Sequence, residues 1–458
     1  MALLLGVLTT LFSASCTSNI PPHTESSVEK VSVEAPASDG GMDTVVLVVG
    51  CTLRATRMHV YGHKRANTPY LDQLAGQGVR FTRMLSNASW TRPALTALFT
   101  GQLPLRWGID HPGKAIHTPR ALHSDALTLA ERFAAQGWST VGVTGNANAN
   151  ADFGMAQGFQ DYQETTEANP EEFTRTSGSQ LVDQLLEQIS HVKGPVFAQV
   201  VLIDTHAPLP DFPRRLQRLG LSTDKAEVPR LQRYDAAVLA VDDAIRRLDE
   251  GLTKLGRSDR LLTLVGDHGE GLLWPTHHGF GHGHQVYDGN LHVPWIVHGP
   301  GVAWGRSIDG LAQSVDLTPT LVDLAGLASD QAGESPVLDG RSLAAQVRGE
   351  LNETRTSRVF SETLYGAEHR SRLTTPQWAF IRNFRNQESA PRGERELYAD
   401  KDRLQHDNLV IQQPVVADRL EQEIDALRSL LREDQRIYET TVGADVTQAL
   451  EALGYVER

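Results

Sequence analysis

The pentapeptide Gly266-Asp267-His268-Gly269-Glu270 places a carboxylate and an imidazole side by side, directly after the apolar run 261–265. An Asp-His pair at the end of a strand, with a glycine that turns the chain, presents an oxygen and a nitrogen ligand to a divalent metal ion. The alternative is an aspartate that caps a turn beside an unrelated histidine. The sequence that follows favours the metal site, because residues 277–298 contain six of the chain's 17 histidines.

This His-rich segment offers groups that can take up and release protons. A loop so rich in His and Gly makes a poor core element, and its glycines let the backbone approach a ligand closely. We expect His282 and His284 to belong to a catalytic site. The alternative is that the segment is a solvated loop with no chemical role.

A further histidine follows a second apolar run. Asp204-Thr205-His206 comes directly after residues 196–203. In a parallel sheet His206 would share a rim with Asp267, where it could bind an oxyanion or protonate a leaving group. A structural histidine that is bonded to the backbone is the alternative.

A hydroxyl group precedes the apolar helical pattern 95–99, in the segment Ser89-Trp90-Thr91-Arg92-Pro93. At the beginning of a helix Thr91 could serve only as an N-cap. The helix dipole and the free amides at the same place would also stabilise an anion or a developing alkoxide. The sequence leaves both roles open.

The elements that must position these residues alternate between extended and helical patterns. The run 44–50 is β-branched and continuous, as expected of a parallel strand that helices cover on both faces. Strands separated by helices indicate an α/β fold with a doubly wound, mostly parallel sheet, whose ligands lie at the carboxyl ends of the strands, here just after Val49, Ile203 and Val265. We expect further strands at 139–144, 196–203 and 260–265, and helices at 70–77, 95–99, 126–136, 179–191 and 231–255.

The rest of the chain divides into three parts. Residues 17–43 are rich in Ser, Pro, Glu and Gly and predict a flexible linker before a catalytic domain at 44–355. Shorter extended pieces at 359–363, 378–383 and 396–398, followed by a helical stretch at 417–433, predict a C-terminal subdomain over 356–458 with a small antiparallel sheet and a closing helix.

Residues 1–16 form a short apolar run that ends in small residues and Cys16, the layout of a secretory signal with a bacterial lipobox. We expect an exported protein, periplasmic or at the cell surface, that a lipid on Cys16 anchors to the membrane. A plain signal peptide or a weakly hydrophobic tail is the alternative. The run is too short for a transmembrane helix, which needs about 20 apolar residues.

Composition excludes several classes. With 40% hydrophobic and 22% charged residues the chain is an ordinary globular protein, and not a disordered chain, a collagen or a coiled coil. A formal net charge of −13 argues against a general attraction to nucleic acid. Two cysteines, Cys16 and Cys51, make neither a disulfide framework nor an all-cysteine metal site.

Together these segments resemble the sulfatase branch of the alkaline phosphatase superfamily. The resemblance implies an alkaline-phosphatase-like fold and a hydrolase of sulfuric esters with one divalent metal ion, Ca²⁺. It extends over almost the whole chain after the linker, and its motifs occur in the family's order: Cys51-Thr52-Leu53-Arg54, Tyr61-Gly62, Thr68-Pro69-Tyr70-Leu71-Asp72, Gly78-Val79-Arg80-Phe81, Thr91-Arg92-Pro93-Ala94-Leu95, Thr100-Gly101, Asp204-Thr205-His206-Ala207-Pro208, Gly266-Asp267-His268-Gly269-Glu270, Tyr287-Asp288, Val293-Pro294, Val315-Asp316-Leu317, Pro319-Thr320-Leu321, Asp339-Gly340-Arg341-Ser342-Leu343 and Glu396-Leu397-Tyr398.

The departures from the family pattern bear directly on chemistry. Cys51 stands where the family has a metal-binding aspartate, and Thr91 stands where it has the Cys or Ser that becomes formylglycine. Threonine cannot be converted to that aldehyde hydrate. Ala94 and Leu95 replace the Ser and Arg that follow the family's proline, which removes the processing signal and an arginine that orients the nucleophile.

The replacement of the aspartate changes which metal the site would prefer. Ca²⁺ requires several oxygen ligands, whereas Asp267, His268 and Cys51 together would suit Zn²⁺ better, because thiolate and imidazole select borderline metals. The alternative is that Cys51 is a small buried apolar residue and that no metal binds.

The resulting hypothesis is a hydrolase of an anionic sulfate or phosphate ester on a glycan or a lipid. Thr91 would be the nucleophile, and His206 with His282 or His284 would bind the oxyanion and protonate the leaving group. An unmodified threonine must attack at sulfur or phosphorus, which makes a phosphoester or phosphodiester substrate more plausible than the resemblance to sulfatases alone suggests. The alternatives are a pseudoenzyme that binds an anionic glycan or lipid head group, and a phospho-group transferase that acts through Thr91.

Overall fold

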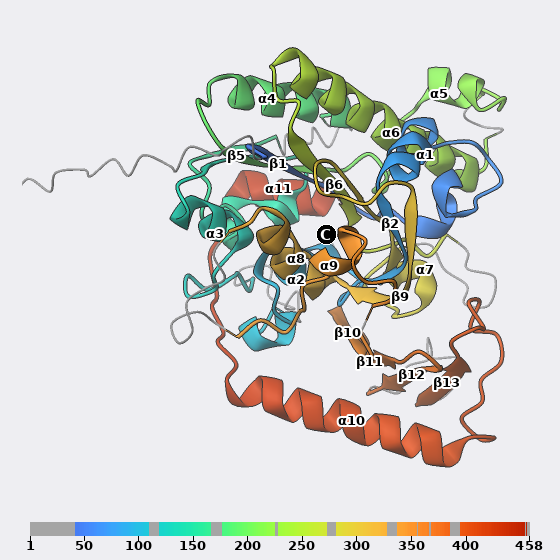
Figure 1. The fold of residues 1–458 in the computed structure, drawn as a ribbon. Helices are drawn as coiled ribbons and strands as arrows, with labels where there is room; N and C mark the ends of the chain where they lie inside the picture. Colours follow the sequence, from blue (N-terminus) through green and yellow to red (C-terminus); the bar gives the residue numbers. More distant parts are fainter. Residues whose placement is uncertain are drawn as a thin grey trace, which may run out of the picture. The chain divides into compact units, whose positions relative to one another are not determined.

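A large twisted sheet forms the centre of the protein in the computed structural model (Figure 1). The structure describes residues 42–109, 119–165, 176–224, 228–272, 281–327, 337–354, 356–365, 368–384, 394–453 and 455. Every described residue lies within the unit Ala35–Arg458. Cys16 and the expected signal segment therefore lie outside the described residues, as does most of the expected linker.

The described residues place nine strands in the central sheet. The order is β4-β3-β5-β1-β6-β8-β2-β7, and β9 pairs with β2. The pairs among β4, β3, β5, β1 and β6 are parallel, whereas β8 pairs antiparallel with both β6 and β2. The strands are β1 (Thr44–Gly50), β2 (Val79–Leu85), β3 (Ser139–Thr144), β4 (Asp161–Glu164), β5 (Val196–Leu202), β6 (Arg260–Gly266), β7 (His292–Val293), β8 (Trp295–His298) and β9 (Arg306–Gln313).

Helices cover both faces of this sheet, which explains why β1 is apolar at every position. Val45, Leu47 and Val49 enter one apolar core, and Val46 and Val48 enter the other, as side chains of a strand alternate between faces. The α-helices that the structure describes between β1 and the second sheet are α1 (Pro69–Gln77), α2 (Thr91–Thr100), α3 (Leu129–Ala135), α4 (Gly178–Ser190), α5 (Pro213–Arg218), α6 (Arg230–Lys254), α7 (Asp288–Leu291), α8 (Leu317–Leu324) and α9 (Ala344–Val347).

Single turns of 3-10 helix lie in several of the loops. They are η1 (Ala55–Arg57), η2 (His59–Tyr61), η3 (Pro104–Trp107), η4 (Ala147–Ala149), η5 (Ala151–Phe153) and η6 (Ser314–Asp316). Two of them, η1 and η4, follow β1 and β3 closely and so lie near the carboxyl ends of these strands.

A second, antiparallel sheet follows in the chain. It consists of β10 (Val359–Tyr365), β11 (Glu368–Thr374), β12 (Trp378–Asn383) and β13 (Arg395–Ala399), paired in that order. The helix α10 (Pro414–Glu433) packs along this sheet, and the last helix, α11 (Ala444–Ala452), returns to the apolar core that contains α2 and α3 (Figure 1). The predicted fold class is confirmed: an α/β protein with a mostly parallel sheet and a small antiparallel sheet.

Two helix boundaries differ from the prediction for local reasons. The helix α2 begins at Thr91 and not at Leu95, because Pro93 in the first turn needs no hydrogen-bonded N–H. The helix α3 begins at Leu129 and not at Ala126, because Thr128 and Glu131 form a reciprocal capping box.

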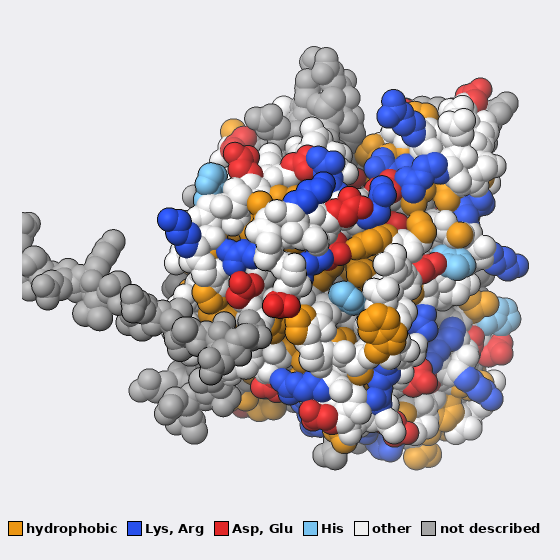
Figure 2. All heavy atoms as spheres, turned by 45° about the horizontal axis from the view of Figure 1, so that its top comes forward, with side chains coloured by type: hydrophobic (Ala, Val, Ile, Leu, Met, Phe, Trp, Pro, Cys, Tyr) orange, Lys and Arg blue, Asp and Glu red, His pale blue; other side chains and the backbone are white. Residues whose placement is uncertain are grey.

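On the face that Figure 2 presents, acidic and basic side chains are mixed over the surface. Within the described ranges we find no helix that combines the length and the apolar character needed to cross a bilayer.

Candidate active site

The carboxyl ends of three neighbouring strands bring the predicted residues together. Gly50 of β1 is in register with Leu202 of β5 and with Gly266 of β6. The next residue of β1, Cys51, donates its N–H to Leu202 O at 2.9 Å, and the N–H of Asp267 donates to Gly50 O at 3.3 Å. This geometry explains why side chains more than 200 positions apart in the sequence share one site.

Cys51, Asp267 and His268 each offer one ligand atom, and these three atoms all lie within 4.8 Å of one another. All three side chains are completely buried. Oδ1 of Asp267 accepts the N–H groups of Thr52 at 2.9 Å and of His268 at 2.6 Å. Oδ2 is buried, has no hydrogen bond to any described residue and lies 3.4 Å from Nε2 of His268. A buried carboxylate oxygen without a donor is costly, and a cation at this position would satisfy it.

The backbone at Thr52 is strained, and the strain serves this carboxylate. Thr52 has a φ of 55°, in the left-handed region that β-branched residues rarely adopt. In this conformation its N–H reaches Oδ1 of Asp267, and its hydroxyl donates to Cys51 O at 2.7 Å. Strained residues cluster at functional sites, where the surroundings hold them in place.

The imidazole of His268 is neutral and has one nitrogen available as a ligand. Its Nδ1 lies 2.9 Å from Gly269 O and donates to it, which leaves Nε2 unprotonated. Burial lowers the pKa of His268 to about 4. A neutral imidazole near pH 7 is the form that a metal ion requires.

Cys51 differs from an ordinary buried cysteine in its polar surroundings. Asn146 donates its Nδ2–H to the sulfur at 3.0 Å, and Thr91 Oγ1 lies 3.7 Å from the sulfur. Burial and the charge of Asp267 raise the pKa of the thiol, so that it is protonated unless a cation replaces the proton. One sulfur, one nitrogen and carboxylate oxygen fit a borderline metal such as Zn²⁺, whereas Ca²⁺ takes six to eight oxygens.

Thr91 is the residue for which the structure separates the two roles that the sequence left open. Trp90 occupies the N-cap position of α2, and no side chain caps the helix there. The Thr91 hydroxyl instead lies 3.2 Å from Nε2 of His268 and 2.7 Å from the phenolic oxygen of Tyr455. The hydroxyl therefore points to the metal-ligand group and does not close the end of the helix.

Two of the predicted histidines lie at this centre. Nε2 of His206 lies 3.0 Å from Tyr455 Oη, and the rings of His206 and His282 are 4.9 Å apart. Nδ1 of His282 lies 3.3 Å from Glu270 Oε2. Although burial of Glu270 opposes it, the hydrogen bond and charge of His282 lower the pKa of this carboxyl. An ionised Glu270 accepts a hydrogen bond from His282 and so orients its ring.

His284 has a different environment from His282. Its ring lies edge-on to Tyr365, with ring centres 4.9 Å apart. Among the described residues it makes no hydrogen bond to Thr91, His206 or Asp267, so of the two alternatives the geometry favours His282. His277 and His278 lie outside the described residues.

Three residues near the centre were not predicted as site residues. Asn146 follows the end of β3, and the strand-end rule that located His206 and Asp267 would have found it. Arg92 is a buried cation without a carboxylate partner in the described part of the chain; its guanidinium donates to Asn148 Oδ1 at 2.9 Å, and burial lowers its pKa to about 9. Tyr455 follows α11, which the sequence pattern did not reveal.

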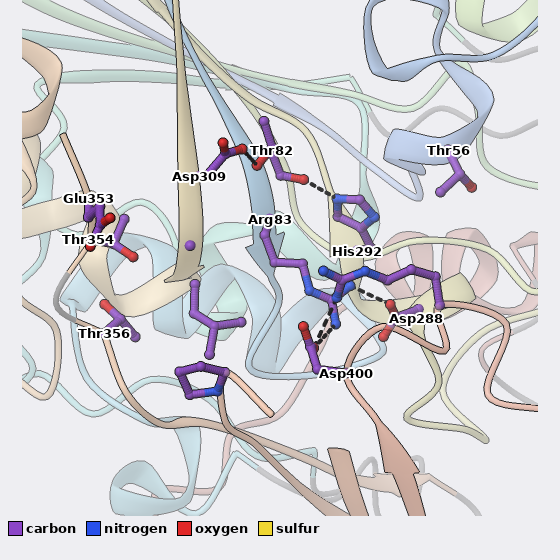
Figure 3. A pocket seen from close by; sticks show the side chains of 14 residues that line it. Thr56, Thr82, Arg83, Asp288, His292, Asp309, Glu353, Thr354, Thr356 and Asp400 are labelled. Carbon is purple, nitrogen blue, oxygen red and sulfur yellow. Dashed lines mark hydrogen bonds and ion pairs between the residues drawn. The ribbon is translucent and has the colours of Figure 1, made fainter. Parts of the chain in front are cut away.

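A separate cavity of about 680 Å³ lies where the two sheets meet (Figure 3). Its charged walls are paired internally: Arg83 forms ion pairs with Asp288 and, at 2.8 Å, with Asp400. His292 lies 3.0 Å from Thr82 O on the same wall. These contacts connect β2 with α7 and with the end of β13, and they stabilise the junction.

The fold and the strand-end centre define an α/β protein of the alkaline phosphatase superfamily. The family model described as Sulfatase matches residues 43–327, and the chain belongs to this family. Arylsulfatase A of Bos taurus is 46% identical over 86 residues, 19% of this chain and 17% of that protein. The ulvan-active sulfatase of Formosa agariphila is 23% identical over 338 residues, 65% of each chain.

The solved structures show the same fold. The phosphonate monoester hydrolase of Agrobacterium radiobacter superposes with a TM-score of 0.68 at 18% identity, over 87% of this chain and 97% of that one.

The matches to the curated relatives Arylsulfatase A and the ulvan-active sulfatase span less than two thirds of their length, 17% and 65%.

Proposed function

We propose that the protein hydrolyses an anionic ester, a sulfate or phosphate ester, with the unmodified hydroxyl of Thr91 as the nucleophile. The observation that carries this proposal is the position of Thr91 Oγ1. It lies 3.2 Å from Nε2 of His268, which is one of the three ligand residues, and Tyr455 Oη connects it to Nε2 of His206. A hydroxyl that closes no helix end and points to a buried polar centre is placed for nucleophilic attack.

Thr91, the two histidines and Glu270 each have a role in the proposed reaction. Thr91 Oγ attacks the sulfur or phosphorus of the ester, the bond between that sulfur or phosphorus and the departing ester oxygen breaks, and the Thr91 hydroxyl proton passes to the one imidazole of the pair, His206 or His282, that is neutral. A protonated imidazole, His206 or His282, gives its proton to the departing ester oxygen. Glu270 holds His282 in the orientation for that transfer. Water then attacks the covalent intermediate and regenerates Thr91.

Asp267, His268 and Cys51 are the residues that would hold a divalent metal ion, and their chemistry favours Zn²⁺ over Ca²⁺. When bound there, the ion would act as a Lewis acid that lowers the pKa of the neighbouring hydroxyl and neutralises charge on the ester.

The substrate class remains an ester on a glycan or a lipid. Support for a glycan comes from a solved relative whose structure holds D-glucosamine-2-N,6-O-disulfate, at 15% identity. The phosphonate monoester hydrolase supports phosphorus chemistry in the same fold.

The test is turnover of aryl sulfate, aryl phosphate and aryl phosphonate monoester, each with and without Ca²⁺, Mn²⁺ and Zn²⁺. We expect turnover of at least one ester that depends on Zn²⁺ or Mn²⁺, and a Thr91 adduct of the sulfuryl or phosphoryl group in protein quenched during turnover. Binding of inorganic sulfate without turnover of any ester would favour the pseudoenzyme. Transfer of a phospho-group to an added alcohol in place of water would favour the transferase.

We also propose that the protein is exported and that a lipid on Cys16 anchors it to a membrane, from the apolar run and the lipobox-like Ser13-Ala14-Ser15-Cys16. Mass spectrometry of the mature protein should find Cys16 as the modified first residue. Cys16→Ser should release the protein or leave an uncleaved precursor. An unmodified N-terminus elsewhere would contradict the anchor.

A further inference from the structure

Tyr455 reaches the candidate active site from the segment that follows α11. Its phenolic oxygen lies 2.7 Å from Thr91 Oγ1 and 3.0 Å from Nε2 of His206. Its ring lies 5.3 Å from the ring of His206 and 5.7 Å from that of His282, measured between centres. The side chain therefore touches the proposed nucleophile and lies beside both proposed proton donors.

The directions of these hydrogen bonds follow from one contact. Nδ1 of His206 donates to Ala207 O, so that its Nε2 accepts a hydrogen bond in the neutral ring. The Tyr455 hydroxyl donates to this nitrogen and can accept from the Thr91 hydroxyl. In this state the Tyr455 hydroxyl connects Thr91 to the neutral ring of His206, and both of its hydrogen bonds are made.

A substrate would have to occupy the space next to Thr91 and His206 in which the Tyr455 hydroxyl lies. The sulfur or phosphorus of an ester must lie next to Thr91 Oγ1, and the departing ester oxygen must lie next to an imidazole. A direct hydrogen bond between Thr91 and Tyr455 leaves no room for a tetrahedral anion between these oxygens. Thr91, Asp267 and His268 have no exposed surface, and His206 is 1% exposed.

Tyr455 is held in place mainly by a short helix. Its N–H donates to Leu450 O at 2.9 Å, at the end of α11. The helix buries three side chains, Val446, Ala449 and Leu450, against the core that contains α2 and α3. The preceding connection, residues 434–443, is largely exposed. Elements that move in proteins are drawn from those with few buried contacts, and α11 itself has only these three fully buried side chains.

A cavity of about 560 Å³ lies between the residues that follow His206 and the end of α11. Ala207, Pro208 and Leu209, which follow His206, form one wall, and Glu451, Ala452 and Leu453 at the end of α11 form another. Arg230 and Arg233 also line it and give it positive charge.

We propose that α11 and Tyr455 form an autoinhibitory plug, which occupies the place of the ester and must withdraw before an anionic substrate can reach Thr91. This proposal rests on the proposed function for the roles of Thr91 and His206. An anion and the Tyr455 side chain then compete for the same place. Withdrawal of the plug also uncovers the Cys51 sulfur, 3.7 Å from Thr91 Oγ1.

The experiment compares the full-length wild type with Tyr455→Ala and Tyr455→Phe. The matched control is Tyr438→Phe, at an exposed tyrosine in the connection that precedes α11. One readout is the affinity for inorganic sulfate by calorimetry. The second is the rate at which iodoacetamide labels Cys51, followed by peptide mass spectrometry. The third is kcat/KM on the best ester of the substrate series.

We expect Tyr455→Ala to bind sulfate at least tenfold more tightly and to label at Cys51 at least tenfold faster, with labelling slowed by added sulfate. Tyr455→Phe, which keeps the ring and loses the hydroxyl, should fall between Tyr455→Ala and the wild type, and Tyr438→Phe should match the wild type. Where turnover is measurable, kcat/KM should rise in Tyr455→Ala.

Unchanged sulfate affinity and unchanged Cys51 labelling in Tyr455→Ala would overturn the plug. Loss of turnover in both Tyr455 variants at unchanged sulfate affinity would also overturn it and would make Tyr455 a catalytic residue. If no protein turns over any ester, the hydrolase proposal fails while the sulfate and labelling readouts still decide whether the plug exists.

Discussion

The sulfur of Cys51 lies 3.7 Å from the hydroxyl oxygen of Thr91, and both side chains are completely buried. At both positions the resemblance to the family implies a different side chain, so the two expected departures form one contact and not two separate losses. A thiol beside a hydroxyl changes the donor set from oxygen-rich to mixed sulfur, nitrogen and oxygen. The preference for a metal should change with it.

Cys51→Asp should reverse the metal preference. The wild type is expected to retain Zn²⁺ over Ca²⁺, whereas the variant offers a second carboxylate and should gain Ca²⁺ affinity relative to Zn²⁺ by an order of magnitude or more. The measurement is elemental analysis after dialysis against both ions at equal concentration. Cys51→Ser serves as a control that removes the sulfur without adding a charge. Absence of stoichiometric metal from both the wild type and Cys51→Asp would contradict the idea of a usable site.

Asp267→Asn should abolish metal binding, because this carboxylate has the buried oxygen without a hydrogen-bond donor. In the wild type, Zn²⁺ at about 100 times its Kd should stabilise the fold by about 2.7 kcal/mol, and the variant should show no such gain. Thermal unfolding with and without Zn²⁺ measures this difference. Asp339→Asn, at a carboxylate that pairs with Arg106, is the control and should respond to Zn²⁺ as the wild type does. An equal Zn²⁺ response in Asp267→Asn would remove Asp267 from the site.

The sequence predicted those site residues that a local rule can locate. Cys51, His206 and Asp267 follow apolar runs, and the carboxyl ends of parallel strands meet at one rim. The same rule applied to β3 would have identified Asn146. Tyr455 could not be found in this way, because its contact with Thr91 depends on the docking of α11, far away in the sequence. Similarly, β11 escaped prediction because it carries Glu368, Arg370 and Arg372, whose charges are paired within the fold and hide its extended pattern.

Thr91→Ala should lower kcat by at least two orders of magnitude if Thr91 is the nucleophile, because the covalent route is closed. Thr91→Ser keeps a hydroxyl at the same place and should retain most of the activity. Thr96→Ala removes another buried hydroxyl from α2, one that donates to Arg92 O, and should leave kcat unchanged. Steady-state kinetics on the best ester measures all three. Equal turnover of Thr91→Ala and the wild type would eliminate Thr91 from the mechanism.

The stability of the protein should fall with pH below about 6.5, in part because of His292. Burial and the nearby charge of Arg83 lower the pKa of this histidine to about 4, although Asp288 opposes the shift, and Arg403 adds to it. In the unfolded chain a histidine titrates near 6.5, so that between these values the unfolded state binds a proton that the folded state does not. The contribution of His292 is complete above about pH 6.5 and is lost as the pH falls towards 4.

His292→Gln keeps a donor for Thr82 O and removes the titration. From pH 7 to pH 5 the wild type should therefore lose about 2 kcal/mol more unfolding free energy than His292→Gln. Urea denaturation at the two pH values measures this difference, and His406→Gln, at an exposed histidine, should behave as the wild type. The same loss in His292→Gln as in the wild type would show that His292 is not the group responsible.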